Sequence, residues 1–210
     1  MDGPERRREA PYTFFLPHPD FIDALEVGDH AKLGFEYDPP GEKYGGERMW
    51  VLITGIDGHR YSGTLDNEPE EPILAHGDKV EFERKHILDV DYAEGKAEPC
   101  VPPTRSYWAR CFVDDCVYKS CVPVEYLYRE EPEELEGHKH PDSGWRIRGR
   151  QGDATDQEME EREASFVALG VVLNKDDSWL HLIDAPIGSA FMRNFETNRY
   201  EPVEFSSSSD

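Results

Sequence analysis

Residues 49–56 read MWVLITGI and carry the strongest strand signal in the first half of the chain. Their β-branched and aromatic side chains are enriched in strands. Asp57-Gly58 follows directly, and this pair favours a two-residue hairpin turn. Residues 61–65, YSGTL, then predict the returning strand. We therefore expect an antiparallel hairpin to organise the first half.

The rest of the first half extends this hairpin. Residues 30–37, 79–82 and 87–90 have the composition and alternation of strands. Residues 21–27, FIDALEV, predict a short helix that Pro19 opens. The first half is therefore expected to be a helix followed by a small, strongly bent, barrel-like antiparallel sheet.

The second half contains three further strand signals, in residues 106–113, 122–129 and 145–148. The middle segment alternates its valines and tyrosines. Because strand side chains alternate between two faces, we expect these four on one face: Val122, Val124, Tyr126 and Tyr128.

Helix and turn signals follow in the C-terminal part. Residues 153–164 predict a charged helix, capped at Asp153 or at Thr155. Residues 166–173 are apolar, and their period does not distinguish helix from strand. Residues 179–203 predict a short helix followed by a closing hairpin.

These elements predict an α+β protein of two small units, each a bent antiparallel sheet with one or two short helices. The β-rich first unit spans residues 16–93, and the α+β second unit spans residues 106–204. Residues 94–105 contain three prolines and one glycine and are expected to form a linker. We expect residues 1–15 to be flexible and residues 205–210 to be disordered.

The charge balance excludes several classes of partner. The 210 residues include 45 Asp and Glu against 23 Lys and Arg, which gives a formal net charge of −22. Such a chain is repelled by nucleic-acid phosphates and by anionic membrane surfaces, so neither is an expected partner. No apolar stretch approaches the roughly 18 residues of a membrane-spanning helix. The N-terminal Arg cluster lacks a following apolar region, so we expect no secretory leader and a cytoplasmic location.

The cysteines raise the question of a metal site. All four lie within 22 residues, at Cys100, Cys111, Cys116 and Cys121. Zinc ligands favour spacings of about two to four residues, whereas the gaps here hold ten, four and four. His138-Lys139-His140 is the one local histidine pair, and its spacing is weak support for a ligand set. We therefore expect reduced thiols and no metal or cofactor, with a Cys/His metal protein kept as an alternative.

Catalytic signals are sparse. P-loop, GxSxG, HExxH and GxGxxG motifs are missing from the sequence. Asp184 is the best candidate for a partly buried acid, although a carboxylate that accepts backbone N–H bonds at a turn is the simpler interpretation. Ser143 lacks the strand–turn–helix setting of a nucleophile and is expected to lead into a core Trp145. Trp50 is likewise expected in the core. The chain is therefore not expected to be an enzyme.

Acidic runs are the remaining feature. Residues 130–136 hold five Glu, and residues 153–163 hold six acids against one Arg. A third group contains Glu68, Glu70 and Glu71. Charge runs are usually solvated faces, but such runs also attract basic partners. The expected partner-binding residues are Glu130, Glu131, Glu133, Glu134, Asp153, Asp156, Glu160 and Glu161.

Three motifs of the second unit resemble a known bacterial family. They are YREEP at residues 128–132, DSGWRI at residues 142–147 and LIDAPIGSAFMRN at residues 182–194. In this order they resemble immunity protein family thirty-three of polymorphic toxin systems, first catalogued as a domain of unknown function. The resemblance covers about residues 106–204. It implies a non-enzymatic cytoplasmic protein that binds and neutralises a cognate toxin, and it supplies no catalytic residues.

The first unit resembles a small β-rich bacterial domain of unknown function, often fused to or encoded near such immunity-like domains. The resemblance rests on LEVGDHAKLGFEY (25–37), GERMWV (46–51), GTLDNEP (63–69) and HGDKVEFERKHILDV (76–90). Together with the acidic runs, the two resemblances lead us to expect a protein that binds a basic toxin domain. An accessory or housekeeping binding module without a toxin is the other alternative. The oligomeric state is left open.

Overall fold

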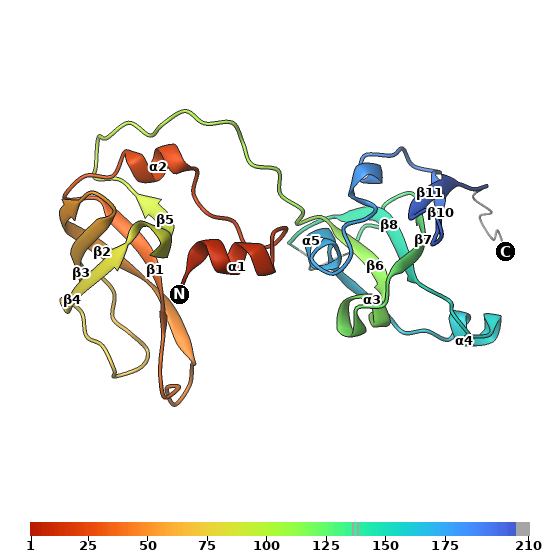
Figure 1. The fold of residues 1–210 in the computed structure, drawn as a ribbon, viewed down its shortest axis with the longest axis horizontal. Helices are drawn as coiled ribbons and strands as arrows, with labels where there is room; N and C mark the ends of the chain where they lie inside the picture. The colour runs from red at the N-terminus through yellow and green to blue at the C-terminus, as the bar shows by residue number, and fades with distance from the viewer. Residues whose placement is uncertain (136, 138, 205–210) are drawn as a thin grey trace. The chain divides into compact units, whose positions relative to one another are not determined.

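The computed structural model describes residues 1–135, 137 and 139–204. It divides into two compact units, Met1–Thr104 and Arg105–Asp210, each considered by itself here. Both units combine strands with short helices, so the predicted α+β class is confirmed (Figure 1). None of the described helices is long and apolar enough to span a membrane.

The first unit is built on one antiparallel sheet. Its strands follow the order β4-β3-β2-β1-β5. The predicted hairpin is confirmed, because β2 pairs with β3 and Asp57 lies opposite Arg60. The strands are β1 (His30–Glu36), β2 (Gly46–Asp57), β3 (Arg60–Leu65), β4 (Lys79–Glu83) and β5 (Ile87–Asp91), and the helices are α1 (Gly3–Glu9), α2 (Pro19–Asp23) and the 3₁₀ turn η1 (Arg84–His86).

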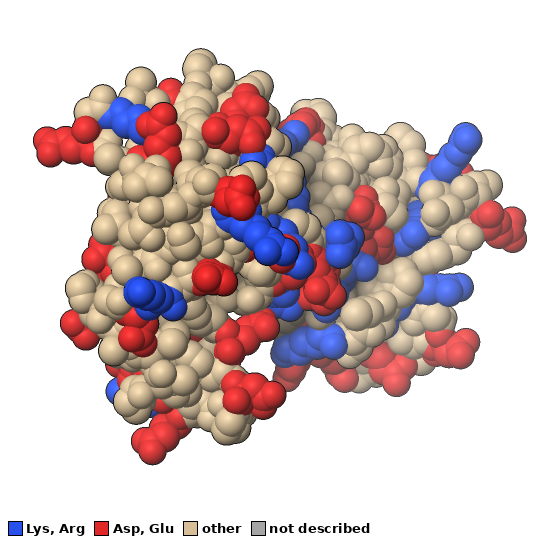
Figure 2. Space-filling view, turned by 60° about the vertical axis from the view of Figure 1, so that its left-hand side comes forward, with Lys and Arg blue, Asp and Glu red and all other residues tan. Residues whose placement is uncertain are grey.

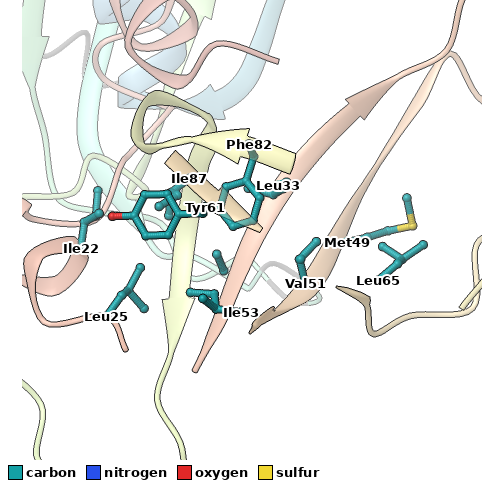
Figure 3. Packing of buried hydrophobic residues seen from close by; sticks show 11 residues of the cluster. Ile22, Leu25, Leu33, Met49, Val51, Ile53, Tyr61, Leu65, Phe82 and Ile87 are labelled. Carbon is teal, nitrogen blue, oxygen red and sulfur yellow. The ribbon is translucent and has the colours of Figure 1, made fainter. Parts of the chain in front are cut away.

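The core of the first unit lies on one face of this sheet (Figure 3). Met49, Val51 and Ile53 of β2 are buried there because alternate residues of a strand share a face. The same alternation directs Trp50 to the opposite face, where Lys32 Nζ lies 4.5 Å from its ring centroid. The expectation that Trp50 belongs to the core is therefore wrong.

The N-terminal segment begins with helix α1. Asp2 caps α1 by accepting a hydrogen bond from the Glu5 N–H. Gly3 is buried, and a Cβ there would lie 2.9 Å from the Leu16 side chain. This close approach explains why the first turn of α1 carries a glycine.

The second unit contains a six-stranded sheet in the order β11-β10-β7-β8-β6-β9. One pair, β6 with β8, is parallel, whereas the expectation was an antiparallel sheet throughout. The cause is topological, because β7 lies between β6 and β8 in sequence but outside them in the sheet. The strands are β6 (Arg110–Asp114), β7 (Val124–Arg129), β8 (Asp142–Gly149), β9 (Ala164–Ala168), β10 (Ala190–Asn194) and β11 (Arg199–Pro202), and the helices are α3 (Asp115–Ser120), α4 (Asp156–Glu160), α5 (Leu169–Leu173) and the 3₁₀ turn η2 (Leu180–Leu182).

Several local predictions for the second unit are confirmed. Thr155 caps α4 and forms a capping box with Glu158. The closing hairpin pairs β10 with β11. Residues 166–173 show no single period because they end β9 and then form α5.

The core of the second unit lies between the sheet and the helices α3 and α5. Trp145 of β8 and Trp179 are fully buried, with ring centroids 5.9 Å apart. Val117 of α3 and Val172 of α5 are also fully buried. The prediction that Trp145 is a core residue is confirmed.

Candidate functional site

The two faces of the second sheet have different environments. A Cβ on Gly149 would contact Cys116 and Val117 of α3, so this face of β8 is the helix-covered one. Val124 lies opposite Gly149 and is fully buried on the same face. Figure 1 shows α3 and α5 together beside β6, while α4 lies apart from them.

A bulge in β7 changes the face of the residues that follow. The register shifts between Val124 and Tyr126, so that Tyr126 lies opposite Arg148 and Tyr128 lies opposite Arg146. A one-residue bulge moves the next side chains to the other side of the sheet. The expectation that Val124, Tyr126 and Tyr128 share a face is therefore wrong.

The face opposite the helices carries rings and arginines in register. We call it the open face and define it by Phe112, Tyr126, Tyr128, Arg146, Arg148 and Phe166. The Phe112 and Phe166 ring centroids lie 4.8 Å apart, and those of Tyr126 and Tyr128 lie 5.5 Å apart. Arg146 Cζ lies 4.7 Å from the Phe112 ring centroid. The result is a continuous aromatic–arginine surface across four strands.

Arg146 is the electrostatic centre of one end of the open face. Its side chain is 7% exposed and contacts three carboxylates. Nη1 and Nη2 donate to the two oxygens of Asp142 at 3.0 and 2.9 Å. Nε donates to Glu130 at 2.5 Å, and Nη2 lies 3.2 Å from Glu133 Oε1. One guanidinium therefore serves three carboxylates.

Asp142 stays ionised at this position. Burial opposes its charge, but hydrogen bonds from the Arg146 side chain and from the Glu133 and Gly144 N–H groups outweigh burial and hold the pKa of Asp142 below 3.8. Burial also opposes the charge of Arg146, yet the carboxylates raise its pKa. The site therefore keeps a surplus of negative charge.

Arg129 is next to Glu130 in the sequence, but its side chain has other partners. It donates instead to the Ser143 and Ala185 carbonyl oxygens, and its Cζ lies 5.8 Å from the Trp145 ring centroid. Arg146 forms the ion pair with Glu130, because its side chain projects from the open face. The Arg129 side chain lies against Trp145.

The second acidic group lies at the other end of the open face. Arg148 donates to the Met159 carbonyl oxygen of α4, and its Nε lies 2.8 Å from Asp114 Oδ1. A shallow hollow of about 230 Å³ opens beside these residues, and its lining includes Tyr126, Glu160 and Met192. Helix α4 therefore borders the open face.

The eight predicted partner-binding residues thus fall into two sets of four. The first set, Glu130, Glu131, Glu133 and Glu134, precedes β8, and the second set, Asp153, Asp156, Glu160 and Glu161, follows it. β8 is not extended throughout, because two residue steps on β6, from Arg110 to Phe112, match four on β8, from Asp142 to Arg146. Glu130 and Glu133 contact Arg146 at one end of the open face, and Asp156 and Glu160 line the hollow beside Tyr126 at the other. The other four are exposed. Figure 2 shows acidic side chains spread over the visible surface with Lys and Arg between them.

The third acidic group has a structural role. Glu71 is 2% exposed, and its carboxylate accepts hydrogen bonds from the N–H groups of Glu42, Lys43 and Tyr44. These bonds lower the pKa of Glu71. Glu47 in turn accepts the N–H groups of Glu70 and Glu71. The two carboxylates fasten the loop between β1 and β2 to the loop that follows β3.

Asp184 is not the partly buried acid that its sequence position suggested. The Asp184 side chain is 74% exposed and forms a two-point ion pair with Arg105, which lowers the pKa of Asp184. Ser143 donates its Oγ hydrogen to the Arg110 carbonyl oxygen. A main-chain acceptor of this kind does not activate a hydroxyl as a nucleophile.

The thiols and histidines form no metal site within the described residues. Within the described residues, no group of three or more His, Cys, Asp or Glu side chains could hold a metal ion. Cys111 is fully buried, and burial raises the pKa of its thiol. His140 stacks on Trp108 with centroids 6.0 Å apart, and His138 lies outside the described residues.

Sequence reasoning missed the open face itself. The alternations Tyr126-Leu127-Tyr128 and Arg146-Ile147-Arg148 were its visible signals. In each, the apolar central residue is buried on the helix side. This alternation places aromatic or arginine side chains on the face opposite the core. These residue types are enriched in protein interfaces.

A family model matches most of the second unit. The family model described as the immunity protein Imm33 domain matches residues 111–204. The predicted resemblance of the second unit is thereby confirmed, and that of the first unit stays a prediction. Neither a curated protein nor a solved structure matches the chain.

Proposed function

We propose that this chain, whose residues 111–204 form an Imm33 domain, is an immunity-type protein. In this proposal it binds a cognate toxin domain in the bacterial cytoplasm and blocks it without a chemical step of its own. The family match supports an immunity role, and the open face supplies a surface on which a partner can bind.

The open face is the observation that carries the proposal. Arg and aromatic residues are enriched in the centres of protein interfaces and dominate their binding energy. Here they form one surface on the side of the sheet away from α3 and α5, and Met192 beside them is 41% exposed. A sheet face built only for solvent would carry fewer rings.

Charge supports a basic partner. The net charge of −22 and the acidic sets at both ends of the open face favour a cationic toxin domain. Complementary charge speeds association and makes it sensitive to salt. The proposed contacts therefore include the eight acids named above in addition to the rings.

The test is co-expression with the C-terminal domain of the toxin-like protein encoded beside this chain. The wild type is expected to restore growth and to purify with that domain as a stable complex. The double variant Tyr126→Ala/Tyr128→Ala is expected to lose both effects while its thermal unfolding stays cooperative. Tyr44→Ala is the matched control, because Tyr44 is an exposed tyrosine of the first unit.

Two results would overturn the proposal. One is a wild type that neither binds nor protects against the neighbouring domain. The other is a folded double variant that protects as well as the wild type and the Tyr44→Ala control.

A further inference from the structure

We infer that the partner meets the open face with a neutral, apolar segment that has basic side chains at both of its ends. This inference rests on the proposed function and specifies the chemistry of the toxin surface.

The centre of the open face offers rings and no free cation. Arg146 is already bound by Asp142, Glu130 and Glu133. Arg148 is held by Asp114 and by a carbonyl oxygen of α4. A partner carboxylate would find these guanidiniums neutralised and the neighbouring carboxylates repulsive. An apolar group can instead pack against the half-buried rings of Phe112 and Tyr126 and gain hydrophobic free energy.

The end near Arg146 accepts a cation. Three carboxylates share one guanidinium there, and Glu131 and Glu134 are exposed next to them in the chain. A hollow of about 470 Å³ is lined by Glu133, Glu134, Asp142, His140, Leu135 and two prolines. A Lys or Arg side chain fits this lining, because its aliphatic stem packs on Leu135 while its head reaches the carboxylates.

The end near α4 also combines carboxylates with apolar side chains, around the smaller hollow of about 230 Å³. Asp156 and Glu160 lie one turn apart on α4, and both line the hollow that also contains Tyr126, Met159 and Met192. Residues four apart share one helix face, so both carboxylates border the same apolar floor. A partner cation here would lie beside a methionine–tyrosine surface, as at the first end it lies beside Leu135.

β8 connects the two ends. Glu130 and Glu133 contact Arg146, and Arg148, two residues further along β8, lines the hollow that contains Asp156 and Glu160. The partner is therefore expected to place its cations far enough apart to contact both ends at once.

The test measures association and dissociation rates with an inactivated form of the neighbouring toxin C-terminal domain as the probe. Glu131→Lys/Glu134→Lys reverses charge at the first end, and Asp153→Lys/Glu160→Lys reverses it at the second. Each pair is expected to slow association about tenfold at low salt, with the two effects multiplying in the combined variant. Dissociation should change less than about threefold, because rim charges act mainly on the encounter.

Two controls separate this pattern from a general charge effect. Glu94→Lys/Glu98→Lys makes the same charge change at exposed positions of the first unit and should alter association less than about twofold. Tyr126→Ala removes a ring from the centre and should raise the dissociation rate at least about tenfold with little change in association.

The outcomes distinguish failure of this inference from failure of the proposed function. If the wild type binds and protects, but reversal at either end leaves association equal to the control, the two-ended contact is wrong and the immunity function stands. The same conclusion follows if the control pair slows association as much as the end variants. If the wild type neither binds nor protects, the proposed function fails and the inference fails with it.

Discussion

Arg146 and Asp142 lie four residues apart on β8 and form a two-point ion pair that is closed to solvent. Nη1 and Nη2 of the arginine donate to the two carboxylate oxygens at 3.0 and 2.9 Å. The Asp142 side chain is 0% exposed, and that of Arg146 is 7% exposed. The pair therefore couples the stability of the second unit to the surface on which we place the partner.

Asp142→Asn is expected to destabilise the second unit by about 3 kcal/mol. Removing one member of a buried ion pair leaves the other charge poorly compensated. Urea unfolding followed by tryptophan fluorescence measures this, because Trp145 and Trp179 are fully buried in the same unit. Glu133→Gln is the control and should cost less than about 1 kcal/mol, since the Glu133 side chain is 54% exposed. Equal costs for the two variants would contradict the role of burial.

The stability of the second unit should depend on pH through Asp142 and Asp176. Burial opposes ionisation of both, but hydrogen bonds and a nearby arginine outweigh it and hold each pKa below 3.8. As pH falls, the unfolded chain therefore binds protons first, and stability is lost. The free energy of unfolding should be flat from pH 7 to about 5 and should decrease below about pH 4.

Asp142→Asn provides the comparison for this pH dependence. The variant lacks one carboxyl with a lowered pKa, so its stability should decrease less steeply below pH 4 than that of the wild type. Urea midpoints measured at several pH values give both slopes. Identical slopes would mean that Asp142 does not contribute.

Gly144→Ala should destabilise the second unit by about 2 kcal/mol or more. Gly144 has φ +80°, and a Cβ there would lie 2.2 Å from the Glu130 carbonyl oxygen. Gly152→Ala is the control, because φ is +59° there but nothing lies within 4 Å. It should cost only about 1 kcal/mol, the strain of the left-handed conformation. Thermal unfolding of both variants tests this, and equal losses would exclude the steric contact at Glu130.

Cysteine labelling should separate the four thiols. Cys111 is fully buried and its thiol pKa is raised by burial, so iodoacetamide should modify it only after unfolding. Cys100 and Cys121 are exposed and should react in the native protein. Mass spectrometry after timed quenching gives the order. If Cys121 were as protected as Cys111 in the native protein, the free-thiol arrangement would be wrong.

Local sequence patterns predicted much of the fold. The Asp57-Gly58 turn, the closing hairpin of β10 and β11, and the Thr155 cap are all found in the structure. These features depend on residues a few positions apart, whose conformational preferences act before any distant contact forms.

The predictions that failed depend on distant contacts. The bulge before Tyr126 places the tyrosine side chain on the opposite face of the sheet, and no residue pattern in β7 indicates this bulge. Asp184 lies at the surface, where it pairs with Arg105, a residue far away in the sequence. The ion pair between Arg146 and Glu130, which no local pattern indicates, likewise depends on the face from which the arginine projects.

The sequence by itself determined the α+β class, the acidic charge and the family resemblance of the second unit. Composition and short-range pattern are sufficient for these properties. Only the tertiary structure decided that Asp142 is buried beside Arg146, and that Glu130 and Asp156 lie near opposite ends of one aromatic face. Burial and ion pairing depend on which strands become neighbours, and neighbouring strands such as β6, β8 and β9 come from segments that are far apart in the chain.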